Sequence, residues 1–241
     1  MTGTLLNIVT VVIGSLLGTI LGNRLPDKMR QTVMSGLGLM TAVVGMQMAL
    51  GTRNVLLVMG SVLVGGVLGE WWQIQEKLEA VGRWLEERVG GAMGAGDERS
   101  ITRAFVTASL VFCIGPMTIL GSIQDGLTGD YSLLAIKSML DGFAALAFSA
   151  TLGPGVILSV LTILVFQGGI SLAAMSIGSA LGTVTRQTPW VIEMTAAGGV
   201  LILGISLILL DLRRIRVANL LPAIVIAPLA QLLLERLGIS L

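Results

Sequence analysis

Long runs of apolar and small residues, separated by short polar segments, make up most of the chain. The first runs extend from about Leu5 to Gly22, Val33 to Leu50 and Val55 to Gly69, and each approaches the roughly 20 residues that a helix needs to cross a bilayer. Strands of a membrane barrel would alternate apolar and polar residues over about 10 positions, whereas Val11 to Leu21 is apolar or small throughout. The pattern predicts an all-α fold, a polytopic bundle of transmembrane helices.

Later parts of the chain predict further spans, at Ile101 to Ile123, Ser132 to Leu152, Pro189 to Leu210 and Val217 to Leu234. The segment from Gly153 to Thr185 is too long for one perpendicular crossing at 1.5 Å per residue. We expect one broken helix or two short ones there, hinged at Gln167-Gly168-Gly169. About eight spans result, within a range of seven to nine. The positive-inside rule favours eight with both termini outside, because few loop cations then fall on the outer face: Arg53, Arg186 and Arg236.

One segment departs from this pattern, EWWQIQEKLEAVGRWLEERV at residues 70–89. Its apolar residues share one helical face and its charges lie mostly elsewhere, and its tryptophans are typical of a helix at the membrane interface. Packing on the protein's own cytosolic surface, or on a second copy, is an equal alternative. A glycine-rich connector follows. The predicted organisation is therefore one membrane domain with a three-span part at 1–70, this helix and connector at 71–98, central spans at 101–152, and a second repeat-like part at 153–241.

The amino-acid composition excludes several classes of function. The 241 residues are 54% hydrophobic and 12% charged, far below the quarter that soluble domains carry. The chain has no histidine and a single cysteine, Cys113, which excludes histidine-based zinc and haem sites, histidine-activated nucleophiles and internal disulfides. The net charge of +1 argues against nucleic acid. We expect no cofactor, no metal and no enzymatic activity.

Two internal similarities suggest repeats. IGSLLGT at 13–19 recurs as IGSALGT at 177–183, and under eight spans the two copies cross in opposite directions, the inverted arrangement of many secondary transporters. A chance match in a chain rich in Gly, Leu and Ile is the alternative. A weaker similarity duplicates the pair Gly115-Pro116 as Gly153-Pro154.

Ionisable residues inside spans are costly and usually face a cavity or a partner. Lys137 and Asp141 are four residues apart, hence on one helical face, where they can neutralise each other or contact a ligand. Asp125, beside Gln124, is expected to end the fourth span, and QDGLTGDY at 124–131 is expected to form a turn rich in Gly and Asp. Within that span, Gly115-Pro116 either kinks a continuous helix or starts a half-helix, whose positive end would then lie near the membrane interior.

Several uncharged polar residues lie in or beside apolar runs, and helix–helix hydrogen bonds explain them as well as solute contact does: Asn7, Gln167 and Asn219. Glu193 opens a span near the interface and is expected to be solvated. Cys113 is expected to be a small core residue.

Three stretches carry a family resemblance: NIVTVVIGSLLG, LGEWWQIQEKLEAVG and especially SLVFCIGPMTILGSIQDGLTGD. They resemble an uncharacterised bacterial membrane-protein family, domain of unknown function 554, the YqgA/YdfK-like proteins. The resemblance covers essentially the whole chain. It implies an inner-membrane location and at most a role in transport, and it supplies no substrate and no catalytic residues.

The leading hypothesis is therefore a transporter or channel for a small solute or ion in the bacterial inner membrane. Its candidate pathway residues are Gly115, Pro116, Gln124, Asp125, Lys137, Asp141, Asn7, Gln167 and Asn219. One alternative is a membrane scaffold or sensor that acts through the 70–98 helix, as a homo-oligomer or with another partner. A membrane enzyme with an Asp125/Asp141 carboxylate pair is the weakest, because it requires the two carboxylates to share a proton.

Overall fold

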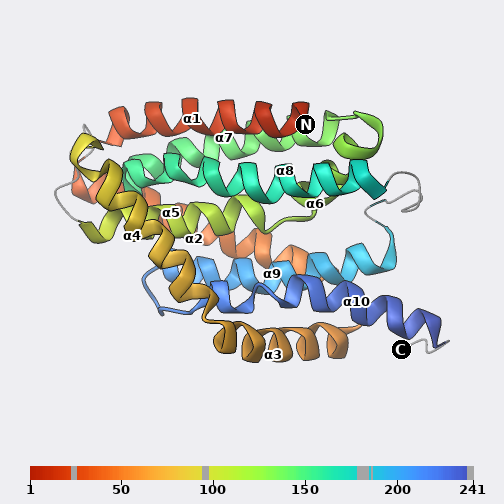
Figure 1. Cartoon of the computed structure of the whole chain (residues 1–241). Coiled ribbons are helices and arrows are strands. Elements are labelled where there is room, and N and C mark those ends of the chain that lie inside the picture. The colour runs from red at the N-terminus through yellow and green to blue at the C-terminus, as the bar shows by residue number, and fades with distance from the viewer. Residues whose placement is uncertain (23–25, 94–97, 178–184, 186, 238–241) are drawn as a thin grey trace. The chain divides into compact units, whose positions relative to one another are not determined.

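The computed structural model describes residues 1–22, 26–93, 98–177, 185 and 187–237, and its regular structure there is helical (Figure 1). The helices are α1 (Thr2–Gly22), α2 (Asp27–Ala49), α3 (Val55–Trp72), α4 (Ile74–Met93), α5 (Glu98–Cys113), α6 (Pro116–Thr128), α7 (Ser132–Leu152), α8 (Ser159–Ile177), α9 (Pro189–Leu209) and α10 (Ala223–Arg236), with short 3-10 helices η1 (Pro154–Leu158) and η3 (Val217–Leu220).

Seven of these segments are long and apolar enough to cross a membrane: α1, α2, α3, α7, η1 with α8, α9, and η3 with α10. The pair α5 and α6 forms an eighth if it makes one crossing, although it bends by 62° at its break. Large apolar side chains on these helices are exposed in rows, as on α1 at Leu5, Val9, Ile13 and Leu16, which suits contact with lipid. The predicted all-α polytopic bundle is confirmed.

The described chain forms two compact units, and each contains segments distant in sequence. Unit 1 comprises Met1–Gly36, Leu78–Cys113 and Met117–Thr183, and unit 2 comprises Leu37–Lys77, Ile114–Pro116 and Val184–Leu241. The repeat-like parts predicted from the sequence stay a prediction, because the second copy of the motif falls on residues 178–183, outside the described ranges.

In unit 1, α1 lies along α7 in close contact (Figure 1). Glycines make this approach possible. A Cβ atom added at Gly14 would lie 2.1 Å from the carbonyl oxygen of Gly142, and one at Gly18 would lie 2.2 Å from that of Leu146. Small residues allow such backbone contact where lipid supplies no hydrophobic drive between helices. Phe112 of α5 and Phe148 of α7 pack at 6.2 Å between ring centroids in the same unit.

In unit 2, α3, α9 and α10 enclose a core of small and branched side chains. It consists of Leu57, Val58, Ala196, Ala197, Ala223 and Ala227. Backbones are again close, because a Cβ added at Gly65 would lie 2.5 Å from the backbone nitrogen of Ala223. Helix α2 approaches α9 in the same way, at Gly45 and Gly199.

Both Gly-Pro pairs mark helix starts. Helix α6 begins at Pro116 and η1 begins at Pro154, so the half-helix alternative, not a continuous kinked helix, describes the Gly115-Pro116 region. The carbonyl oxygen of Phe112, at the end of α5, accepts a hydrogen bond of 3.1 Å from the Thr118 hydroxyl. A break inside a membrane is tolerated when freed backbone groups find such partners.

Two predicted boundaries are wrong. Helix α8 continues through Gln167-Gly168-Gly169, and the irregular point of this segment lies instead at Gly153, whose φ is 98°. The two glycines stay helical because an unpaired backbone group in hydrocarbon costs more than their low helix propensity. Helix α6 continues to Thr128, so Gln124 and Asp125 lie inside a helix, not in the predicted turn at its end.

Candidate functional site

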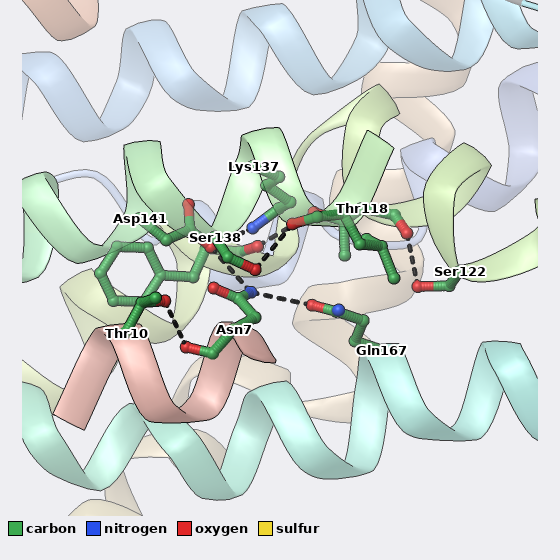
Figure 2. A network of polar contacts seen from close by, with 10 residues as sticks. Asn7, Thr10, Thr118, Ser122, Lys137, Ser138, Asp141 and Gln167 are labelled. Atoms are coloured by element: carbon green, nitrogen blue, oxygen red, sulfur yellow. Dashed lines mark hydrogen bonds and ion pairs between the residues drawn. The ribbon is translucent and has the colours of Figure 1, made fainter. Parts of the chain in front are cut away.

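A buried polar network connects α1, α7 and α8 within unit 1 (Figure 2). The Asn7 Nδ2 atom donates two hydrogen bonds of 3.0 Å, one to Asp141 Oδ2 and one to Gln167 Oε1. Lys137 Nζ forms an ion pair with the same Asp141 oxygen. All four side chains are buried, and Asn7 and Gln167 expose at most 1% of their surface.

The ion pair follows from local helix geometry. Lys137 and Asp141 are four residues apart on α7 and therefore lie on one face, as the sequence predicts. Both charges are removed from water, so each needs the other: a buried charge left without its partner is strongly destabilising. The pair is neutral as a unit, so it adds no net charge to the interior of unit 1.

Asp141 also fixes the orientation of both amides. Asn7 must turn its Nδ2 group toward the carboxylate, since the reverse orientation would place two acceptors against each other. That same Nδ2 group then meets Gln167, which must present its oxygen. Asp141 on α7 therefore fixes the amide orientation of Asn7 on α1, and Asn7 in turn fixes the amide orientation of Gln167 on α8.

Three buried polar atoms beside this network have no hydrogen-bond partner among the described residues: Thr4 Oγ1, Asn7 Oδ1 and Gln167 Nε2. Thr4 and Asn7 lie one turn apart on the buried face of α1. A Cβ added at Gly168 would lie 3.8 Å from Thr4 Cγ2, which places Thr4 beside α8 at the residue after Gln167. Buried polar atoms without partners are uncommon and require an explanation.

Asp125 lies on α6 and faces the first turn of α1. Its Oδ2 atom accepts a hydrogen bond of 3.2 Å from the Gly3 backbone amide and lies 2.9 Å from the Met1 amino group. The expectation that Asp125 lies at the end of a span is wrong, because the residue is 3% exposed inside α6. The unpaired amides and positive dipole at a helix start attract a carboxylate, and that explains its burial.

The two candidate aspartates therefore have separate cationic partners: the Met1 amino group for Asp125 and Lys137 for Asp141. Gln124, next to Asp125, is half-buried, and its carbonyl oxygen accepts a hydrogen bond of 2.9 Å from the Thr128 hydroxyl. Gly115 and Pro116 mark the break before α6. Within the described ranges, no cluster of three or more metal-ligating Cys, Asp or Glu side chains occurs.

Asn219 belongs to a different set of contacts, all within unit 2. Its Oδ1 atom accepts a 2.7 Å hydrogen bond from the Gln75 amide, and its Nδ2 atom donates a 2.6 Å bond to Glu70 Oε2. Arg216 pairs with Glu70 at 2.5 Å and with Glu76 at 3.1 Å. These bonds hold η3 against the turn between α3 and α4, so helix–helix bonding accounts for this candidate.

Sequence reasoning missed two residues. Glu193 was expected to be solvated, yet it is 2% exposed. Its carboxylate accepts hydrogen bonds from the Arg53 amide at 2.9 Å and from the Thr52 hydroxyl. Thr4 was not predicted at all. A helical-wheel plot of α1 contains the signal, because Thr4, Asn7 and Val11 share one face with Gly14 and Gly18.

The described residues form seven or eight apolar segments long enough to cross a membrane, and a polar network is buried within unit 1. These features define the class: a polytopic α-helical membrane protein. Within this class the chain belongs to the family described as Protein of unknown function (DUF554), whose family profile matches residues 2–232. The family resemblance expected from the sequence is confirmed.

Two relatives cover nearly the full length. The chain is 29% identical over 243 residues to Uncharacterized membrane protein YdfK of Bacillus subtilis (strain 168), covering 99% of each chain. It is 27% identical over 226 residues to Uncharacterized protein YqgA of Escherichia coli (strain K12), covering 93% of this chain and 94% of that protein. No solved structure matches the chain significantly.

Proposed function

We propose that the protein transports a small solute or ion, as a transporter or a channel, and that the pathway passes the network of Asn7, Lys137, Asp141 and Gln167. One observation supports this most directly. Four polar side chains, two of them charged, meet in the interior of unit 1, and two amide atoms among them lack partners in the described structure. Ionisable groups inside membrane segments are typical of substrate or ion pathways.

The broken helix supports the same proposal. Short helices that start inside the membrane line the solute sites of many transporters, and α6 starts at such a break. Thr118 and Ser122, on α6, are buried in the same unit (Figure 2). We consider two mechanisms by which a solute could reach the network. This half-helix moves in alternating access, or the solute passes through a polar cavity beside it.

The experiment compares three forms of the ion pair in proteoliposomes loaded with a panel of ions and solutes. The single variants Asp141→Asn and Lys137→Ala each leave one charge uncompensated. The double variant Lys137→Met/Asp141→Asn removes both charges and keeps similar side-chain volumes. If the pair acts in transport, the double variant folds and its flux falls about tenfold or more, since a purely structural pair can be replaced by neutral groups at little cost.

A matched control uses the ion pair of unit 2, as Arg216→Met/Glu70→Gln, because that pair is more than half exposed. Its flux should equal that of the unmodified protein. A double variant of Lys137 and Asp141 that transports at the unmodified rate would show that this ion pair is structural only, and it would remove Lys137 and Asp141 from the pathway.

Three further expectations belong to this proposal. The membrane is the bacterial inner membrane, the protein is not an enzyme, and it acts alone or as a homo-oligomer. Reconstitution of the purified chain without other proteins tests the last of these, because flux must then occur from this chain in lipid alone.

A second candidate function is a membrane scaffold that acts through α4. One face of this helix packs on α5, where a Cβ at Gly82 would lie 2.9 Å from Thr102. The other face exposes Val81 and Trp84, with the Arg88 guanidinium 4.6 Å from the Trp84 ring centroid. If the protein is such a scaffold, chemical cross-linking should capture a partner with the unmodified protein but not with the variant Val81→Ser/Trp84→Ala. Neither protein should then show solute flux.

A further inference from the structure

The charge of unit 1's interior restricts the kind of solute that the network can accept. Lys137 and Asp141 cancel each other, and the Met1 amino group balances Asp125. Transfer of an ion into this interior would therefore meet no unbalanced opposite charge. Burying a charge without a partner costs far more than burying a neutral polar group that finds hydrogen bonds.

The buried polar atoms without hydrogen-bond partners restrict the kind of solute further. Asn7 Oδ1 accepts hydrogen bonds, Gln167 Nε2 donates them, and Thr4 Oγ1 can do either. The two amides are joined by the 3.0 Å bond between Asn7 Nδ2 and Gln167 Oε1, so the unpaired acceptor and the unpaired donor lie on either side of one hydrogen bond (Figure 2). We call these three atoms the amide site.

An ion of either sign is poorly matched to the amide site. A cation can pair with Asn7 Oδ1 and Thr4 Oγ1 but leaves the Gln167 amide donor without a partner. An anion can pair with Gln167 Nε2 but leaves Asn7 Oδ1 without one. A solute that carries both acceptors and donors, as hydroxyl and amide groups do, can pair with both kinds of atom.

We propose that the amide site binds a small uncharged solute that carries hydroxyl or amide groups, and that the Lys137–Asp141 pair sets the orientation of the amides without contacting the solute. This inference rests on the proposed transport function and names its substrate class. Thr4, Asn7 and Gln167 are then binding residues, and Asp141 is a positioning residue that acts through Asn7.

The test measures two kinds of flux in proteoliposomes of the full chain. Stopped-flow light scattering follows entry of glycerol, urea and acetamide, and a voltage-sensitive dye follows Na⁺, K⁺ and Cl⁻. We expect at least one neutral probe to enter faster than in empty liposomes, with no ion-dependent voltage change. Gln167→Leu should lower that entry rate about tenfold or more, since a hydrogen-bonding site that loses its donor loses selectivity for its ligand.

Two variants separate binding from folding. Gln167→Glu keeps the shape of the side chain but replaces the donor by an acceptor, so it should also lower entry of the neutral probe. Gln231→Leu on α10, whose amide bonds the exposed Glu235, should leave the rate unchanged. Gel filtration in detergent should show one monodisperse species for every form, and a variant that aggregates is replaced by Thr4→Val.

The outcomes are distinct. Ion currents without entry of a neutral probe overturn the neutral-solute inference and leave the transport proposal standing. Entry of a neutral probe that is insensitive to Gln167→Leu, Gln167→Glu and Thr4→Val overturns the amide site, whose free atoms then hold an ordered water only. If no probe of either kind enters, the transport proposal and this inference both fail.

Discussion

Among the residues that the structure describes, three carboxylates are buried, those of Asp125, Asp141 and Glu193. They occupy different chemical environments, and the donors around each one define its role. Asp141 meets a lysine and an amide, Asp125 meets the start of α1, and Glu193 meets the loop between α2 and α3. A buried carboxylate is stable only when such donors replace its water. The role of each carboxylate can therefore be tested by substituting the residue and measuring the change in the free energy of unfolding.

Glu193 gives the clearest test at the residue scale. Glu193→Ala leaves the Arg53 amide and the Thr52 hydroxyl without their charged acceptor, and should lower the free energy of unfolding by about 2 kcal/mol. Unfolding in mixed detergent and SDS micelles measures the change. Glu193→Gln keeps one carbonyl acceptor and should lose less. The exposed Glu235 serves as control, and equal losses for Glu193→Ala and Glu235→Ala would contradict the anchoring role.

Sequence reasoning at this scale was successful only for near neighbours. Lys137 and Asp141 could be paired because helical periodicity alone places residues four apart on one face. The bonds from Asn7 to Asp141 and Gln167 span 134 and 160 residues. They depend on how α1 lies between α7 and α8, which no local pattern specifies. Glu193 was misjudged for the same reason, since its donors come from another helix connection.

At the scale of elements, glycine positions determine how closely helices approach. Gly14→Ala or Gly18→Ala would force a methyl group against the backbone of α7, where the nearest oxygen lies 2.1 or 2.2 Å from the added atom. We expect each to cost about 1–3 kcal/mol of stability. Gly60→Ala on α3 is the matched control, because nothing lies within 4 Å of its added atom. Thermal unfolding in detergent compares the three, and equal melting temperatures would exclude close packing of α1 on α7.

The start of η1 depends on one backbone conformation. Gly153 has φ 98° and ψ −175°, a region that only glycine adopts readily. Gly153→Ala should cost about 1–3 kcal/mol through backbone strain. Gly169→Ala, within α8 and with nothing inside 4 Å of its added atom, should be neutral or slightly stabilising. If both variants unfold at the same temperature, the break before η1 does not require glycine.

Element boundaries could be predicted where the apolar run alone sets them. Helices α3 and α9 begin at the predicted residues, Val55 and Pro189, because the polar loops before them are unambiguous. The breaks could not be predicted as well. Gln167-Gly168-Gly169 has the composition of a hinge but continues as helix. Gly126, expected in a turn, belongs to α6 and packs closely on α8, because a Cβ atom added there would lie 2.2 Å from the Ser171 carbonyl oxygen.

At the scale of the whole molecule, hydropathy determines the class of protein, and it leaves one question of topology to the bent pair α5 and α6. Each of its helices is shorter than the roughly 20 residues of a full crossing. Two arginines, Arg99 and Arg103, lie at its start, and the sequence contains no Lys or Arg from Ala104 to Ile136. The positive-inside rule then places its start in the cytoplasm and its end outside, so we expect a crossing and eight spans.

Accessible cysteines can decide this. On a Cys113→Ser background, Gly51→Cys reports the connection after α2, and Gly129→Cys reports the connection after α6. If α5 and α6 cross together, an impermeant maleimide labels both positions from outside intact cells, and Arg213→Cys is labelled only after permeabilisation. If the pair re-enters, Gly129→Cys is labelled only after permeabilisation and Arg213→Cys becomes accessible from outside, because three crossings separate these two positions. The same result determines the direction of the repeat, because the copies at 13–19 and 177–183 run in opposite directions with eight spans and in the same direction with seven. Labelling of Gly51→Cys and Gly129→Cys from opposite sides would therefore exclude an inverted repeat.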